Sequence, residues 1–191
     1  MKSLLVVLVT LLSVYGFAGT INPVTKSVNI QESKIEWKGY KVTGSHTGTI
    51  SIKSGNFDFD ENGILTGGNF IIDMSTIEVT DLKGGGAAKL KGHLTSADFF
   101  GVENHPEATF TITKVISRGT SNQYKIIGDL TIKNITKEIK FNADINESTA
   151  TADIVIDRSD FDIRYGSGSF FDNLGDKTIY DEFDLSITLV L

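Results

Sequence analysis

The amino-acid sequence predicts an all-β fold of about eight antiparallel strands with one short helix inserted among them. Polar and apolar residues alternate along most of the chain, short polar turns separate the alternating stretches, and a single stretch has helical spacing instead. The alternation is clearest in residues 124–145, where Ile126 and Leu130 alternate with polar residues before a short polar turn, and Phe141 belongs to a second run that alternates in the same way after it. Because a period of two places side chains on opposite faces of a strand, this stretch is predicted to be a hairpin with one apolar face.

The first 18 residues have the pattern of a secretory signal peptide. Lys2 precedes an almost wholly apolar run from residue 4 to 14, and small residues surround the expected cleavage position at Ala18. We therefore expect residues 19–191 to be one exported domain, periplasmic or secreted. A retained membrane anchor is the alternative, but spanning a bilayer takes roughly 20 apolar residues.

Composition narrows the choice of partners. Without Lys2 the chain has 17 basic and 24 acidic residues, a net charge of −7, which argues against nucleic acid and anionic membrane surfaces as partners. No further apolar run is long enough to predict a stable membrane span after removal of the leader. The chain has no cysteine, so its stability must come from a hydrophobic core.

The strands follow one another along the chain after a start, residues 19–28, that we expect to be flexible. Ser54 and Gly55 are expected to form a bulge in the second strand, and residues 60–63 a turn after it. The connection inside the 124–145 hairpin is expected at residues 134–137. The expected strands are residues 35–40, 47–59, 64–79, 108–113, 124–132, 139–145, 150–157 and 183–191.

The single helix is predicted near residues 84–94. Ala87, Leu90 and Leu94 follow a triple glycine at helical spacing. Phe99 and Phe100 come directly after the helix, and they are expected either to form a flap or to anchor this loop in the core. Residues 159–176 are expected to form a long loop.

Eight antiparallel strands can close into a barrel that is filled by side chains or holds one small ligand. Closure would also remove exposed sheet edges, and a two-sheet sandwich is the competing architecture. Small residues such as Ala108, Gly128 and Ala143 share the inward parity with large apolar ones. From parity alone, a solid core and a ligand cavity remain equal alternatives.

Catalytic and metal-binding motifs are weak throughout, so we predict no catalytic residue and no metal site. His46, His93 and His105 lack the spacing that places two imidazoles on one helix or strand face. Residues 58–63 resemble half of a calcium loop, but Asn69 occupies the position that needs a bidentate glutamate. Arg158, among aspartates, is interpreted either as a local ion-pair partner or as a group at the barrel mouth that holds a ligand head group.

Three motifs together resemble the YceI-like family. The first is Leu94 with Asp98-Phe99-Phe100, followed by His105-Pro106 and Ala108-Thr109-Phe110. The second runs from Gly128-Asp129-Leu130-Thr131 to Thr136-Lys137, with Asn134 where the family usually has glycine, and the third is Arg158-Ser159-Asp160-Phe161. Their order and spacing agree with the family over most of residues 35–191.

This resemblance implies an extended, eight-stranded lipocalin-like barrel that binds an isoprenoid, such as a polyprenyl quinone, in its cavity without enzymatic activity. No cofactor is required, and a homodimer is left open. Bulky residues at Gly128 or Ala143 are expected to block ligand uptake without unfolding the barrel. The alternative function is a stress-responsive protein-interaction module with a solid core. The expected cavity wall is Trp37, Ile50, Ile52, Phe57, Phe70, Leu90, Leu94, Phe99, Phe100, Phe110, Ile112, Ile126, Gly128, Leu130, Phe141, Ala143, Phe161, Phe183 and Leu185, with Arg158 as the head-group candidate.

Overall fold

The computed structural model of the chain describes residues 24–120 and 122–191. The signal-peptide prediction lies outside these residues and stays a prediction. The described strands are β1 (Val24–Ser27), β2 (Lys34–Lys41), β3 (Gly44–Phe59), β4 (Leu65–Val79), β5 (Glu107–Ser117), β6 (Gln123–Ile132), β7 (Ile135–Ile145), β8 (Thr149–Asp157) and β9 (Ile179–Val190). The helices are α1 (Gly85–Thr95) and the short 3₁₀ helices η1 (Arg158–Phe161) and η2 (Gly175–Lys177).

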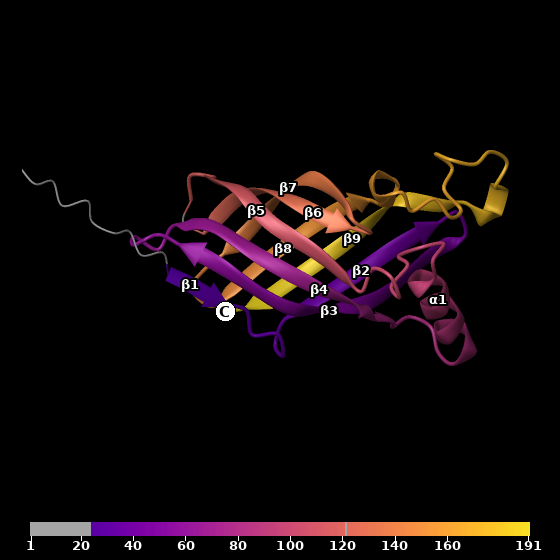
Figure 1. The fold of residues 1–191 in the computed structure, drawn as a ribbon, viewed down its shortest axis with the longest axis horizontal. Helices are drawn as coiled ribbons and strands as arrows, with labels where there is room; N and C mark the ends of the chain where they lie inside the picture. The colour runs from indigo at the N-terminus through magenta and orange to yellow at the C-terminus, as the bar shows by residue number, and fades with distance from the viewer. Residues whose placement is uncertain (1–23, 121) are drawn as a thin grey trace, which may run out of the picture.

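The strands form one closed antiparallel barrel, which confirms the predicted fold class and replaces the sandwich alternative. The sheet order is β3-β2-β9-β8-β7-β6-β5-β4, and β4 pairs with β3 to close the ring (Figure 1). Consecutive strands are neighbours almost everywhere, as short connections favour. The inward face of every strand therefore points into a common interior.

The prediction that residues 19–28 are flexible is wrong for residues 24–27, which form β1. Val24 pairs with Phe59 and Ser27 with Asn56, and the Val28 N–H donates to the Gly55 carbonyl at 2.9 Å. β1 thus continues the edge of β3 beyond the end of β2. The backbone groups of this segment are satisfied by pairing with β3, and the alternation pattern of the segment does not reveal this pairing.

The hairpin of residues 124–145 has a tighter turn than expected. Lys133 (φ 50°) and Asn134 (φ 64°) both adopt the left-handed conformation, and β7 begins at the next residue. A two-residue loop with positive φ at both positions matches the right-handed twist of the flanking strands. Asparagine tolerates this conformation, which explains how it stands where the family usually has glycine.

The turn after β3 is built as the sequence predicts. The Asp60 carboxylate accepts hydrogen bonds from the backbone N–H groups of Asn62 (2.9 Å) and Ile64 (2.8 Å), and Gly63 takes a positive φ of 74°. One β3–β4 register shift falls between Ile52 and Ser54, at the expected bulge. The Asp60 carboxylate thus serves a hairpin turn.

One strand pair in the ring is much shorter than the others. β7 and β8 pair through Ala143 with Ala152, Asp144 with Thr151, and Ile145 with Ala150. Beyond these pairs, toward η1, the two strands are not joined by ladder pairs. We call this stretch the β7–β8 seam.

The predicted helix is confirmed as α1, at the end of the barrel drawn on the right in Figure 1. Leu94 is its buried residue. The chain then doubles back, because the Phe99 and Gly101 N–H groups both donate to the Ser96 carbonyl, at 3.0 and 2.7 Å, and Gly101 takes a φ of 59°. This turn buries Phe99 and Phe100 beneath α1.

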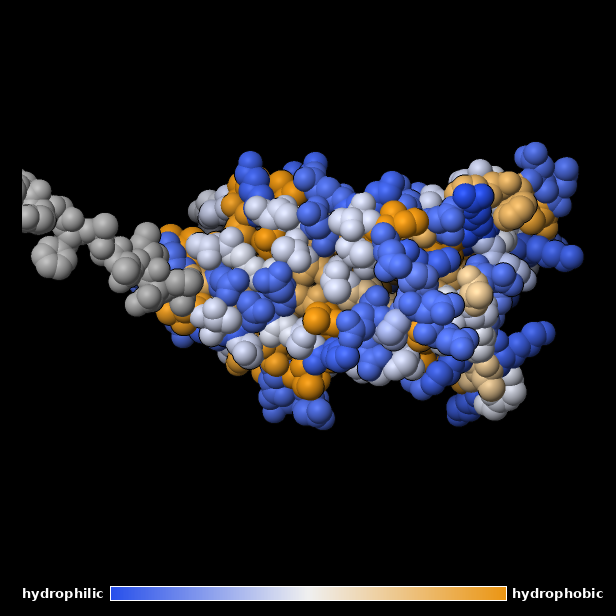
Figure 2. All heavy atoms as spheres, in the orientation of Figure 1, coloured by the Kyte–Doolittle hydropathy of each residue, from blue (hydrophilic) through white to orange (hydrophobic). Residues whose placement is uncertain are grey.

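The outer surface in Figure 2 is mainly polar, with apolar side chains scattered between charged ones. This distribution is ordinary for a folded domain, since isolated apolar residues are common on protein surfaces. Within the described residues, none of the helices has the length and apolar character needed to cross a membrane.

Candidate ligand cavity

The barrel interior encloses a cavity of about 380 Å³. Its lining is almost entirely apolar and is contributed by all eight strands of the ring together with α1 and the turn that follows it. Inward side chains in the middle of the barrel, such as Ile50, Ile72 and Phe141, stay only half-buried because they face this space. The volume lies in the range of roughly 300–1,000 Å³ that is typical of small-molecule sites.

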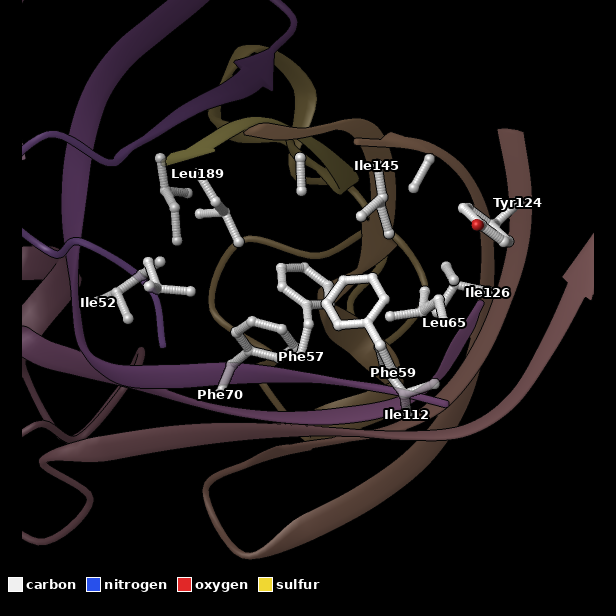
Figure 3. Close-up of a cluster of buried hydrophobic side chains, with 14 residues drawn as sticks. Ile52, Phe57, Phe59, Leu65, Phe70, Ile112, Tyr124, Ile126, Ile145 and Leu189 are labelled. Carbon is white, nitrogen blue, oxygen red and sulfur yellow. The ribbon is translucent and has the colours of Figure 1, made fainter. Parts of the chain in front are cut away.

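The end of the cavity farthest from α1 is closed by buried apolar residues. Ile145, Ala150 and Leu189 line it and are each at most 5% exposed. Phe57 and Phe70 meet edge to face with ring centroids 4.9 Å apart, and Figure 3 shows these rings and Phe59 pointing into the barrel. This cluster forms the floor of the cavity.

The end beside α1 is the mouth. Its lining includes polar and partly exposed residues, among them Tyr40, Lys41 and His46, as well as the exposed Tyr180. The residue 159–176 loop extends beyond the barrel on this side, where Figure 2 shows apolar atoms, and Phe171 is half-exposed there. A ligand would enter from this end.

Hydrogen bonds brace the strands around the mouth. The Tyr40 hydroxyl donates to Asp184 across the β2–β9 pair, and this bond raises the pKa of Tyr40. His46 Nδ1 lies 2.8 Å from the Asp81 carboxylate. Burial raises the pKa of Asp81, but hydrogen bonds from His46 and the Thr47 N–H outweigh it, so the pKa of Asp81 is lowered overall.

The predicted head-group residue, Arg158, is committed to the protein itself. Its side chain is 2% exposed, and its guanidinium donates to the backbone carbonyls of Tyr180 (3.1 Å), Ile163 (2.8 Å) and Ile179 (3.0 Å). Arg158 Nη2 also lies 3.1 Å from an Asp181 carboxylate oxygen as an ion pair. Burial lowers the pKa of Arg158, while Asp181 opposes this shift. The geometry makes Arg158 a fastener between η1 and β9.

Asp181 also fixes the long loop. Its other carboxylate oxygen accepts hydrogen bonds from the hydroxyl groups of Ser167 (2.9 Å) and Ser169 (2.6 Å), and Ser167 is completely buried. The middle of the residue 159–176 loop is therefore tied to β9 by the same carboxylate that faces Arg158.

The cavity lining contains every predicted wall residue except Gly128 and Phe161. Phe99 and Phe100 both belong to the lining and are buried, with ring centroids 5.0 Å apart. They therefore combine the two expected roles, since they anchor their loop and also face the cavity. Contact of any wall residue with a ligand stays a prediction.

Gly128 and Phe161 have packing roles instead. A Cβ built on Gly128 would lie 2.5 Å from the Phe110 ring and 2.5 Å from the Thr111 carbonyl oxygen, so Phe110 already fills the space that the glycine leaves. A bulky residue at Gly128 would thus disturb the barrel, contrary to our expectation. Phe161, 1% exposed, packs in the cluster of side chains around η1.

Several lining residues were not among the predicted ones. Most share inward parity with predicted neighbours, as Ile139 and Ile145 do with Phe141, so the alternation could have found them. His93 could not be found this way, because a polar residue on a short helix is expected to face solvent. The additional lining residues are Ile35, Gly39, Tyr40, Lys41, His46, Ile72, Met74, Ile77, His93, Ala108, Ile132, Ile139, Ile145, Ala150, Thr151, Ala152, Ile154, Ile156, Ile179, Tyr180, Ile187 and Leu189.

The histidines do not form a metal site with other ligands in the described part of the chain. Among residues 24–120 and 122–191, no three histidine or acidic side chains gather closely enough to hold an ion. His46 faces Asp81, and His93 packs its ring against Phe99 and Tyr165, with centroids 5.7 and 4.2 Å apart.

A closed antiparallel barrel with an apolar interior, a sealed floor and a helix beside its mouth defines the lipocalin-like class of hollow barrels. The sequence profile of the YceI-like domain matches residues 20–191. The chain therefore belongs to the YceI-like domain family.

Sequence relatives cover part of the chain. A UPF0312 protein of Photorhabdus laumondii is 36% identical over 99 residues, which are 51% of this chain and 47% of that protein. A UPF0312 protein of Pectobacterium atrosepticum is 35% identical over 97 residues, 50% of this chain and 46% of that protein. The matches thus span about half the length of these relatives.

Solved structures share the fold. BcnA of Burkholderia cenocepacia superposes with a TM-score of 0.67 at 21% identity, covering 86% of this chain and 99% of that one. A polyisoprenoid-binding domain from Saccharophagus degradans, implicated in plant cell wall breakdown, gives a TM-score of 0.59 at 12% identity, covering 88% and 98%. The YCEI protein of Campylobacter jejuni gives 0.56 at 22% identity, covering 73% and 81%.

Proposed function

We propose that this protein is an exported, non-enzymatic carrier that holds an isoprenoid or similar long apolar lipid, such as a polyprenyl quinone, inside its barrel. The observation that supports this most directly is the apolar cavity of about 380 Å³, open beside α1 and closed at the Phe57 end. The polyisoprenoid-binding domain among the structural neighbours is consistent with the same class of ligand.

The shape of the cavity suits a linear ligand. Its lining on β9 extends from Ile179 to Leu189, which at about 3.3 Å per residue is roughly 33 Å of strand and, at a tilt near 40°, roughly 25 Å along the barrel axis. An extended hydrocarbon tail fits such a space, and a compact polar metabolite would leave it largely unfilled.

Transfer energies explain why such a carrier is useful. Each five-carbon prenyl unit costs roughly 3–4 kcal/mol in water, at about 0.8 kcal/mol per methylene group. A tail of several units does not cross an aqueous compartment unaided. The cavity shields the tail, and the polar outer surface keeps the complex in solution.

The alternative, a protein-interaction module with a solid barrel core, is less well supported because the interior is hollow. Mid-barrel side chains such as Ile50 and Ile72 retain exposed surface toward the cavity, which a filled core would remove. No catalytic role is proposed, since the cavity lining is apolar almost throughout.

Trp37 gives a direct assay, because it is the single tryptophan of the chain and lies in the cavity lining. A quinone placed beside an indole quenches its fluorescence, so titration with a long-tailed polyprenyl quinone should quench Trp37 in a saturable way. Native mass spectrometry with organic extraction should identify a co-purifying lipid and also report the oligomeric state. The carrier function is wrong if the protein neither contains lipid nor takes up the added quinone.

The position of the tail is tested by Ala143→Phe. Ala143 lines the cavity, and a phenyl ring there should exclude about one prenyl unit, which weakens long-tail binding by about 3 kcal/mol, roughly 100-fold. Asn142→Phe is the matched control, because Asn142 is the exposed neighbour on the opposite face of β7. Equal affinity of both variants for the quinone would contradict a tail bound inside the barrel.

A further inference from the structure

Exposed aromatic side chains gather at one end of the barrel. In residues 24–120 and 122–191, the tyrosines and phenylalanines with large exposed fractions are Tyr165 (48%), Phe170 (40%), Phe171 (50%) and Tyr180 (52%). We call these four residues the aromatic rim. Three of them belong to the residue 159–176 loop, and the fourth, on β9, belongs to the cavity lining at the mouth. The exposed apolar residues toward the floor, such as Val24 and Ile64, are aliphatic.

Backbone contacts hold the aromatic rim together. The Ile179 N–H donates to the Gly166 carbonyl at 2.8 Å, so the two tyrosines, each next to one of these residues, lie on adjoining segments. The N–H groups of both phenylalanines donate to the Ser167 carbonyl, at 3.2 and 3.1 Å. The four side chains therefore come from one small region, at the end of the barrel beside α1 (Figure 1).

The loop that carries most of the rim is anchored on its buried side. The hydroxyl groups of Ser167, which is completely buried, and of Ser169 both donate to the Asp181 carboxylate. On the outer side, the Arg164 guanidinium lies over the Phe170 ring, 4.9 Å from its centroid. The fold thus holds the two phenylalanines of the rim in solvent, and clustered exposed apolar residues of this kind mark interaction surfaces.

The rim borders the opening of the cavity. Tyr180 is itself a lining residue, and the Tyr165 ring packs against His93, another lining residue, with ring centroids 4.2 Å apart. A large partner seated on the rim would therefore also cover the mouth. A protein in this position would obstruct the path of the ligand, whereas a lipid bilayer would bring the cavity to a source of apolar ligands.

The charges around the rim indicate which bilayer suits it. Residues 159–177 contain four aspartates, one arginine and one lysine, and the arginine, Arg164, is paired with Asp162 at 2.5 Å. This acidic surface repels anionic head groups. A zwitterionic head group instead presents its ammonium or choline group outermost, which carboxylates attract and which aromatic faces bind by cation–π contact. Tyrosine also suits the membrane–water interface, where its ring is buried and its hydroxyl stays hydrated.

We propose that the aromatic rim is a docking surface for zwitterionic phospholipid membranes. The two phenylalanines enter the head-group region, the two tyrosines lie at its boundary, and the mouth of the cavity faces the bilayer. This role rests on the carrier function proposed above, because the docked barrel exchanges its ligand directly with the membrane. Because only a few rings are buried and the surface is acidic, binding is expected to be weak and reversible.

The test measures binding to vesicles without any ligand. Purified protein is sedimented with phosphatidylcholine vesicles over a range of lipid concentrations, which gives a partition coefficient. The double variant Phe170→Ser/Phe171→Ser removes two half-exposed rings, and we expect its partition coefficient to fall about tenfold. Val24→Ser/Ile64→Ser is the matched control, since these residues are each 52% exposed at the other end of the barrel, and it should bind as the wild type does. Thermal melting checks that both variants are folded.

Vesicles enriched in phosphatidylglycerol test the charge argument, and they should bind the wild type more weakly. The docking surface is wrong if the two double variants partition alike, if the wild type does not sediment with phosphatidylcholine, or if the anionic vesicles bind it more tightly. It is also wrong if light scattering shows a dimer that the phenylalanine variant loses while its vesicle binding is unchanged, because the rim would then join two copies of the chain.

The carrier function is tested separately by delivering a polyprenyl quinone from a cyclodextrin complex, which bypasses the membrane. A wild-type protein that sediments with vesicles but takes up no quinone would overturn the carrier function, and with it the exchange of ligand at the rim. A protein that takes up quinone from cyclodextrin, and whose phenylalanine variant sediments with vesicles like the wild type, would overturn the docking surface alone.

Discussion

Replacing Gly128 with alanine should destabilise the barrel, although the change adds only one methyl group. The new Cβ would lie 2.5 Å from both the Phe110 ring and the Thr111 carbonyl oxygen. The ring can turn into the cavity, but the carbonyl belongs to the backbone of β5, the strand that pairs with β6 at this point. Relief of the contact therefore requires β5 and β6 to shift apart locally.

Forcing extra volume into a packed site typically costs about 1–3 kcal/mol, so we expect the Gly128→Ala variant to lose about 2 kcal/mol of unfolding free energy. For a chain of this length that corresponds to a fall in Tm of roughly 4–8 °C. Urea denaturation followed by circular dichroism gives the free energy, and a thermal scan gives the Tm.

Gly39→Ala is the matched control for this experiment. Gly39 also lies in a strand and lines the cavity, but nothing is within 4 Å of a Cβ built on it. Alanine there should be neutral, or stabilising by about 0.5 kcal/mol through the reduced entropy of the unfolded chain. A Gly128→Ala variant that melts with the wild type, or above Gly39→Ala, would refute the close packing of Phe110 over this glycine.

Two further substitutions test the fasteners around the mouth. Arg158→Met removes the partner of one Asp181 carboxylate oxygen and of three backbone carbonyls. The free energy of unfolding should therefore fall by about 3 kcal/mol in urea denaturation, and an unchanged value would assign Arg158 no structural role. The folded-state pKa of Asp81 lies below its usual value of 3.8, so its carboxylate stabilises the fold above that pH, and this contribution is lost as the pH falls through the folded-state pKa. The Asp81→Asn variant should therefore lose up to about 1 kcal/mol of unfolding free energy at neutral pH, and its stability should fall less steeply in acid. Urea denaturation at several pH values checks this, and identical profiles for variant and wild type would show that the His46–Asp81 contact does not contribute to stability.

Strand parity was sufficient to predict most of the barrel and its wall. Ile126, Leu130 and Phe141 lie in the lining because a strand has only two faces, so the local pattern fixes their direction once the barrel closes. The helix could also be predicted from the sequence, since the spacing of its apolar residues and the triple glycine before it are local signals.

The errors arose where the environment of a residue comes from distant parts of the chain. Gly128 suggested free volume, but Phe110 from the neighbouring strand fills it. Arg158 was predicted as a residue that holds a ligand head group. Its guanidinium instead donates to the carbonyls of Ile179 and Tyr180, which lie 21 and 22 residues further along the chain. The role of a polar residue in a mostly apolar interior thus depends on its contacts in three dimensions, and the alternation pattern of the sequence does not reveal these contacts.

The β7–β8 seam is the place where no backbone ladder fixes the distance between two neighbouring strands of the barrel. Ladder hydrogen bonds hold neighbouring strands about 4.8 Å apart, so each well-paired strand adds a fixed arc to the circumference. The ladder between β7 and β8 ends before the seam and consists of the pairs between Ala143 and Ala152, Asp144 and Thr151, and Ile145 and Ala150, all toward the floor. Above them, side-chain packing and the 3.4 Å contact between Lys137 and Asp160 join the two sides. The ring is thus closed by side chains at the seam and by backbone pairing between its other strands, so the seam is where the circumference of the barrel is least fixed.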